Sequence, residues 1–380
     1  MPGPLGLLDV LDRGNGSPVT PTRYSAQWLS QDHEPEWDAF VLGHPLGSVY
    51  HSSEWKRVIE QAFPHIRGRF LVIRDGEPGR IRVGLPIYSV RSWLLGNRLI
   101  SVPFATVYNP LVSSLEEWEV LTPELESEGV RTGSKKLEIR TMASGGQLPS
   151  SFGSTSLFRH HTLSLDPDFK VVCARFDKQS VRQKAEKARK AGVIIKERSD
   201  KEGMVAASTL LAATRRRLSL PPMPHRFFEA MQRNLRPDQM KIFLAYQNAE
   251  PIACHIVLIF KDQWISEYSG NADGAISGVN QLLYLETIRQ ACSNGARMFS
   301  FGRTSINNEG LLAYKRRWGT VEETMTDYAL RRDRDNEIQA GDDVSHLENS
   351  RMYQLCKRVI GKVPLPVCKM IGNFCYRHLG

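Results

Sequence analysis

Residues 262–328 constrain the fold of this chain more strongly than any other stretch. Residues 264–269 are aromatic and flanked by polar residues, which predicts a strand. Residues 270–278 are polar and rich in glycine and predict a loop, whereas residues 279–293 repeat apolar side chains at helical spacing. Residues 297–301 then alternate as a half-buried strand does. A strand, a loop, a helix and a second strand in this order indicate an α/β sheet.

Basic side chains gather where this stretch ends. Gly302 and Arg303 follow the second strand, at the end where α/β sheets tend to open a site, and a basic loop at 310–319 contains Lys315. Free N–H groups at the start of helix 279–293 and the planar guanidinium of Arg303 suit a phosphate, a carboxylate or a carbonyl oxygen. The chemistry therefore indicates an anion site. Alternatively, Arg303 pairs with an internal carboxylate and the basic loop is a solvated surface.

Length and charge limit the kind of protein. With 380 residues, 41% of them hydrophobic, two to three globular domains are expected. The formal net charge of +9 favours an anionic partner, which could be a phosphorylated substrate, RNA or a membrane surface. The six cysteines form no CxxC pair and the histidines no zinc-binding spacing, so we expect buried thiols in a reducing compartment and no metal site. Residues 1–16 lack the segments of a signal peptide, which predicts a cytoplasmic protein.

The sequence as a whole predicts a mixed α/β (α+β) fold with two similar units in tandem. Helices, then strands, then a helix and a strand occupy residues 22–155, and the same loose order returns in residues 156–332. We expect each unit to be a mixed sheet flanked by helices. Residues 1–21, rich in Gly, Pro and Asp, are expected to form a mobile tail, and residues 333–380 a linker and a basic amphipathic tail.

Two basic segments indicate contacts with anions. Residues 178–198 carry eight Lys or Arg against two Glu, which is typical of a phosphate or RNA footprint or of a solvated helix face. In the tail, apolar residues share two helical faces: Met352, Leu355, Cys356, Val359 and Ile360 on one, and Val367, Met370, Ile371 and Phe374 on the other. A basic amphipathic pair of helices indicates a contact with the inner face of the cytoplasmic membrane. The alternative is a tail packed on the protein's own surface.

Short strings spread over roughly residues 24–330 carry a family resemblance. They are residues 51–55, 83–87, 96–104, 137–140, 182–192, 214–228, 280–283, 299–303, 310–315 and 318–319. With them the chain resembles the FemAB-like branch of the GNAT acyltransferase superfamily, particularly the proteins found with exosortase/PEP-CTERM exopolysaccharide loci. The resemblance implies two GNAT-like domains and an N-acyltransferase that acts on a cell-envelope or exopolysaccharide precursor.

The resemblance also implies substrates and site residues. The peptidoglycan-bridge members take an aminoacyl-tRNA donor and a lipid-linked or nucleotide-linked muropeptide acceptor. Here it implies no bound cofactor, an aminoacyl-tRNA or acyl-CoA donor, and a lipid-linked or nucleotide-linked sugar or peptide acceptor. Lys315 would stabilise the oxyanion without a covalent intermediate, and Arg303 would orient a phosphate or carboxylate. The implied substrate-binding residues are Tyr108, Glu138, Arg140, Tyr268, Asn280, Trp318 and Arg182.

Two departures from the family pattern bear on the substrates. The Gly-Gly that this branch usually carries after Pro-Phe is replaced by residues 107–110, which leaves the acceptor open. The acyl-CoA loop R-x-x-G-x-[GA] is missing, which disfavours a CoA donor. Two alternatives therefore stay open. They are a CoA-dependent GNAT acetyltransferase and a non-catalytic scaffold that binds RNA or membranes.

Overall fold

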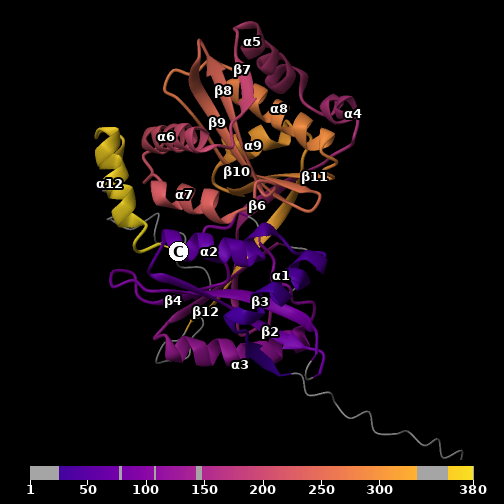
Figure 1. Cartoon of the computed structure of the whole chain (residues 1–380), viewed down its shortest axis with the longest axis vertical. Helices are drawn as coiled ribbons and strands as arrows, with labels where there is room; N and C mark the ends of the chain where they lie inside the picture. Colours follow the sequence, from indigo (N-terminus) through magenta and orange to yellow (C-terminus); the bar gives the residue numbers. More distant parts are fainter. Residues whose placement is uncertain (1–24, 77–78, 107, 143–147, 332–357, 380) are drawn as a thin grey trace, which may run out of the picture.

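A single mixed sheet runs through the molecule and is flanked by helices (Figure 1). The computed structural model describes residues 25–76, 79–106, 108–142, 148–331 and 358–379. The described strands form a 12-stranded sheet in the order β1-β2-β3-β4-β5-β12-β6-β11-β10-β9-β8-β7. The mixed α/β fold class predicted from the sequence is confirmed.

The first half of the molecule, up to residue 142, contains mostly antiparallel strands. Its elements are β1 (Ala26–Trp28), η1 (Gln31–His33), α1 (Glu34–Gly43), η2 (Val49–His51), α2 (Ser53–Ala62), β2 (Ile66–Arg74), β3 (Ile81–Val90), β4 (Arg98–Ile100), α3 (Leu115–Arg131) and β5 (Lys136–Met142). Local chemistry sets several of the boundaries. The α3 helix, for example, begins at a capping box in which Ser114 and Glu117 exchange side-chain to backbone hydrogen bonds.

The second half begins at residue 148. Its elements are β6 (Gly153–Ser164), α4 (Phe169–Ala174), the π-helical η4 (Lys178–Gln183), α5 (Lys184–Lys190), β7 (Ile194–Glu197), α6 (Lys201–Arg217), α7 (His225–Asn234), β8 (Met240–Gln247), β9 (Glu250–Phe260), β10 (Gln263–Asn271), α8 (Val279–Ser293), β11 (Met298–Ser305), α9 (Glu309–Arg316) and β12 (Val321–Arg331). A last helix, α12 (Leu365–Cys375), lies on the outside of the molecule beside α6 and is drawn in yellow in Figure 1.

The two halves share a strand. In Figure 1 the orange strand β12 runs from the second half down into the first. It pairs antiparallel with β5 on one side, where Asp327 faces Arg140, and with β6 on the other, where Glu323 faces His160. The sheet is continuous across the molecule because of this strand.

Two hydrophobic cores lie on opposite faces of the second half of the sheet. The larger core joins both halves, because α2 packs on α7 and aromatic rings meet there. The Phe227 ring lies 6.0 Å from the Trp55 ring and 5.7 Å from the Phe63 ring. The smaller core lies under α5 and α8 and contains Phe299 and Trp318. Burial of large aromatic side chains between α2 and α7 holds the halves together.

One sequence-based expectation differs from the structure, one predicted boundary falls inside a strand, and other predictions fall outside the described residues. The predicted basic loop at 310–319 is largely helix α9, which begins where the Asn308 side chain accepts the N–H of Leu311. The predicted boundary between residues 155 and 156 lies inside β6. The predicted mobile tail at 1–21, most of the linker, and Met352, Leu355 and Cys356 lie outside the described residues.

Candidate active site

Two irregular strands form the centre of the site. The parallel strands β10 and β11 are in register from Gln263 opposite Met298 to Ile265 opposite Ser300. Just beyond these pairs, β10 shifts register against β9 between residues 266 and 268, and β11 shifts register against β6 between residues 300 and 303. Such bulges re-aim side chains and are common beside active sites. Glu267 lies in the first irregularity and Gly302 in the second.

The first half of the chain packs directly on the β11 irregularity. Gly302 has a φ of +68°, a conformation that favours glycine. A Cβ at this position would lie 2.4 Å from Cγ2 of Thr106 and 3.4 Å from the carbonyl oxygen of Ser266. Thr106 belongs to the segment that follows β4. The absence of a side chain at Gly302 therefore allows the two halves to touch at the site.

Glu267 is a partly exposed residue whose carboxylate lies deep between the two halves. The Tyr50 hydroxyl, from η2 of the first half, donates to Oε2. The other oxygen, Oε1, is buried and has no hydrogen-bond partner among the described residues. Burial raises the pKa of Glu267 to about 7, against the opposite effect of the hydroxyls of Tyr50, Thr106 and Tyr268. An acid–base group that titrates near neutral pH is a candidate for proton transfer.

Lys315 holds the β11 irregularity in place. Its side chain is buried, and Nζ donates to the carbonyl oxygens of Gly302, at 2.8 Å, and Arg303, at 3.4 Å. Burial lowers the pKa of Lys315 to about 7. Two hydrogen bonds to successive carbonyls at a bulge fix the backbone there, so the residue predicted to act on an oxyanion is engaged with the main chain in this structure.

The structure brings three of the sequence-predicted residues together. Glu138 and Arg140 lie on β5 and Arg303 lies on β11, with β12 and β6 between these two strands. The Arg303 guanidinium lies 3.6 Å from the centre of the Phe158 ring, and none of the described carboxylates is within ion-pair distance of it. Burial and then the charge of Arg140 lower the pKa of Arg303 to about 10, while Asp327 and Glu138 act in the opposite direction. Two neighbouring guanidinium groups with incomplete neutralisation suit an anionic ligand.

Two other predicted residues belong to the cores. Trp318 is fully buried, with its ring 5.1 Å from Phe176 and 5.6 Å from Phe301. Tyr108 is 2% exposed and stacks on the His51 ring at 4.6 Å. Neither side chain has the accessible surface that contact with a substrate needs. Both large aromatic groups pack the interior instead.

The remaining predicted residues lie on different faces of the sheet. Tyr268 is next to Glu267 and packs edge-on against Phe227 and Phe228 in the larger core. Asn280 lies in the first turn of α8, and Arg182 is exposed on η4, both at the smaller core. A Cβ at the preceding Gly278 would be 2.0 Å from the carbonyl oxygen of Lys184, so the η4–α5 junction covers the start of α8. The helix start is therefore screened from a ligand on that side.

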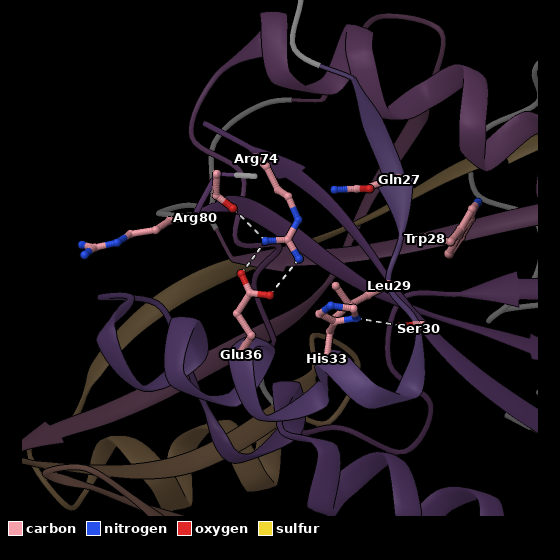
Figure 2. A pocket seen from close by; sticks show the side chains of 9 residues that line it. Gln27, Trp28, Leu29, Ser30, His33, Glu36, Arg74 and Arg80 are labelled. Carbon is pink, nitrogen blue, oxygen red and sulfur yellow. Dashed lines mark hydrogen bonds and ion pairs between the residues drawn. The ribbon is translucent and has the colours of Figure 1, made fainter. Parts of the chain in front are cut away.

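A surface hollow of about 920 Å³ lies elsewhere, beside β1 and η1 (Figure 2). Arg74 and Glu36 form an ion pair on its wall, with Nη2 of Arg74 2.8 Å from Oε2 of Glu36. Arg74 also donates to the carbonyl oxygen of Gly79, whereas Arg80 points away (Figure 2). The principal charges of this hollow are thus paired with each other. Across the described residues, no cluster of His, Cys, Asp and Glu has the arrangement of a metal site.

Sequence reasoning missed Glu267, Tyr50 and Thr106. The signal for Glu267 was a lone carboxylate within the aromatic strand Trp264–Tyr268. Its contact with Tyr50 spans 217 positions of sequence, and no local pattern carries that information.

Comparisons with known proteins agree with this architecture. Residues 175–316 match the family described as acetyltransferase (GNAT) domain, and no curated protein matches the chain. The crystal structure of FemX is similar with a TM-score of 0.62 at 14% identity, covering 88% of this chain and 100% of FemX. The C-terminal domain of a putative lysylphosphatidylglycerol synthetase from Agrobacterium fabrum gives 0.55 at 10% identity, covering 84% of this chain and 98% of that one.

A third solved structure carries the tandem arrangement in its description. It is a tandem GNAT protein from the clavulanic acid biosynthesis pathway, with a TM-score of 0.52 at 11% identity, covering 82% of this chain and 99% of that one. At these identities the likeness establishes the fold. Residues 175–316 thus match a GNAT acetyltransferase domain, and the fold of the chain is similar to that of FemX and of a tandem GNAT protein.

Proposed function

We propose that the protein is an N-acyltransferase in which Glu267 accepts the proton of the attacking amine. The observation that carries this proposal is the Glu267 carboxylate, which lies between the two halves, with no partner for Oε1 in the described part of the chain and a pKa that burial raises to about 7. A base of that strength is matched to an amine that must lose a proton during attack. The GNAT domain and the FemX-like fold support acyl transfer in general.

The reaction needs no covalent enzyme intermediate. The amine nitrogen forms a bond to the carbonyl carbon of an ester or thioester, and the proton of the amine passes to Glu267. The bond from that carbon to the donor oxygen or sulfur then breaks, and the leaving group takes a proton. The site contributes chiefly by orienting the two reactants and by placing the base.

We assign Lys315 a positioning role for this reaction. Its ammonium would have to leave the carbonyl oxygens of Gly302 and Arg303 before it could act on an oxyanion. Losing the lysine would loosen the backbone next to Thr106, which in turn lies beside Glu267. The direct oxyanion role implied by the family resemblance stays a prediction. Substituting Lys315 by Arg or by Met distinguishes that role from the positioning role.

The substrates we propose are an aminoacyl-tRNA or acyl-CoA donor and an amine on a lipid-linked or nucleotide-linked envelope or exopolysaccharide precursor. Both donors and nucleotide-linked sugars carry phosphates, which the Arg303–Arg140 pair is suited to bind. The exposed basic residues of η4 and α5 offer a second surface for the phosphates of a tRNA. Such donors would be met in the cytoplasm.

The test begins with native mass spectrometry of the purified full chain to identify co-purifying tRNA, CoA or sugar-linked lipid. Transfer is then assayed by mass spectrometry with aminoacyl-tRNA and acetyl-CoA donors against nucleotide-linked amino sugars and peptides. We expect Glu267→Gln to lower kcat by about 100-fold or more, whereas Glu250→Gln, on an exposed position of β9, leaves kcat unchanged. For the wild type, kcat should rise with pH through about 7.

Equal rates for Glu267→Gln and wild type would refute the assignment of the base. Salt-sensitive binding of tRNA without any acyl product from any donor would favour the scaffold alternative instead. Displacement of bound donor by free CoA would select the CoA-dependent alternative.

A further inference from the structure

The last helix exposes apolar side chains on the side turned away from the protein. Val367, Met370 and Phe374 are 40%, 70% and 49% exposed, and they recur at helical spacing along α12. The opposite side of the helix, with Cys368 and Gly372, is buried. A helix that is apolar on both sides is usually covered on both sides. The described residues cover only one of them.

The inner side of α12 is firmly docked. A Cβ at Gly372 would lie 2.2 Å from the carbonyl oxygen of Pro222, so the helix approaches the chain before α7 very closely. Just after the helix, the Arg215 guanidinium donates to the Tyr376 hydroxyl at 3.2 Å. One face of α12 therefore packs on the protein, as one of the two alternatives for the tail expects, whereas the other face points outward.

A second apolar group adjoins the helix. In the turn between β3 and β4, Trp93 is 81% exposed, and Leu94 and Leu95 are 37% and 39% exposed. The buried ring of His378 connects this turn to α12, because it lies 5.1 Å from the Trp93 ring and 5.3 Å from the Phe374 ring. In Figure 1, α12 and the region of β4 lie on the same side of the molecule. The two exposed groups are thus parts of one surface.

The charge on this surface has a single sign. Its exposed charged side chains are Arg91, Arg358, Lys362, Lys369 and Arg377. Residues 88–98 and 358–379 contain no Asp or Glu. Apolar side chains with a tryptophan at their edge, surrounded by lysine and arginine, match the boundary between the acyl chains and the anionic headgroups of a bilayer.

We propose that α12 and the turn at residues 91–97 form a docking surface for an anionic lipid bilayer. The helix has 11 residues, too few to span a bilayer, and the described part of the chain contains no helix long and apolar enough to do so. It therefore lies in the plane of the interface. A second copy of the chain fits this surface less well, because a two-fold contact would place the same cations against each other.

Docking in this way brings the candidate active site to the bilayer, a consequence that rests on the proposed function. A series of ring contacts leads from the docked helix to Glu267: Tyr376 lies 5.7 Å from Phe104, Phe104 lies 6.3 Å from Phe227, and Phe227 lies 6.1 Å from Tyr268. Of the acceptors proposed above, this geometry favours the amine of a lipid-linked precursor over that of a nucleotide-linked one.

Lipid binding is tested on the full chain without any acyl-transfer substrate. Trp93 is the most exposed of the seven tryptophans, since five are buried and Trp28 is partly buried. We expect vesicles of phosphatidylglycerol and brominated phosphatidylcholine to quench its fluorescence, and we expect Trp93→Phe to remove that quenching. The wild type should sediment with these vesicles and not with phosphatidylcholine alone.

Matched variants test whether vesicle binding depends on this surface or on exposed apolar and basic side chains in general. Met370→Ser with Phe374→Ser should weaken sedimentation at least about tenfold, whereas Val130→Ser, at a 67% exposed position of α3, should not change it. Changing Arg91, Lys369 and Arg377 to Gln should weaken it by about 100-fold. The same change at Lys184, Lys187 and Lys190 of α5 should have little effect.

Three outcomes would overturn the proposal. They are absence of Trp93 quenching, an equal loss of binding in the α5 variant, and light scattering that shows a dimer lost on Met370→Ser with Phe374→Ser while vesicle binding is unchanged. Glu267→Gln is expected to bind vesicles as the wild type does. A failure of the proposed chemistry and a failure of docking are therefore distinguishable.

Discussion

Gly302 offers the sharpest test of how the two halves meet, because two separate costs act on any side chain there. An alanine must adopt a φ of +68°, which costs about 1–2 kcal/mol for a residue with a Cβ. Its Cβ would also lie 2.4 Å from Cγ2 of Thr106, and relieving such an overlap in a packed interior costs about 1–3 kcal/mol. We therefore expect Gly302→Ala to lower the free energy of unfolding by about 2–5 kcal/mol.

A matched glycine separates the two costs. Gly274 has a φ of +73°, and a Cβ there would meet no atom within 4 Å. Gly274→Ala should therefore lose only the conformational part, about 1–2 kcal/mol. Urea unfolding of both variants, compared at the same transition, gives the contact cost at Gly302 by difference.

Thr106→Ser provides an independent check, because it removes Cγ2 and keeps the hydroxyl near Glu267. In the Gly302→Ala background it should recover about 1–2 kcal/mol relative to its effect in the wild type, as a double-mutant cycle measures it. Equal losses at Gly302 and Gly274, or additive effects of the Gly302 and Thr106 changes, would refute the argument that Thr106 packs on the β11 irregularity.

Two further predictions concern Lys315 and Phe227. Burial lowers the pKa of Lys315 to about 7 in the folded protein, whereas in the unfolded chain it has its ordinary value of 10.5. The unfolded state therefore binds more protons between these pH values. The free energy of unfolding should rise with pH across this window by up to about 1.4 kcal/mol per pH unit. Lys315→Met should remove that rise, as urea unfolding at several pH values will show, and an unchanged slope would contradict the assignment. Phe227→Ala, at a fully buried position between α2 and α7, should cost about 3–5 kcal/mol in urea unfolding, whereas Phe374→Ala on the exposed face of α12 should cost less than about 1 kcal/mol.

Elements with local signals could be predicted closely from the sequence. The predicted helix 279–293 is α8 (Val279–Ser293), and the predicted strand 264–269 lies within β10 (Gln263–Asn271). In both cases the signal is local, because the apolar pattern lies within the segment and turn residues flank it directly. The residues of β12 (Val321–Arg331) do not predict a strand, because Glu322, Glu323 and Asp327 interrupt any apolar alternation. That segment is a strand because β5 and β6 pair with it from both sides.

The candidate site was harder to predict for a related reason. Arg303, Arg140 and Glu138 were named from short motifs, and the sheet does bring them together. The burial of Lys315 could not be predicted, because nothing in the local sequence distinguishes it from the exposed Lys187 in a similarly basic helix. Only the fold shows that the Lys315 ammonium is held by main-chain carbonyls.

The position of Glu267 implies that the two halves work as one unit. The residues that match the GNAT family, 175–316, include Glu267, Gly302 and Lys315 but exclude Tyr50, Thr106, β6 and β12. A chain cut to that range would leave β11 without its β6 neighbour and Glu267 without the Tyr50 hydroxyl and the cover that raises its pKa. The environment that makes this carboxylate a base near neutral pH is therefore supplied by the first half. The proposed chemistry therefore requires both halves, since the second half carries the base and the first half sets its strength.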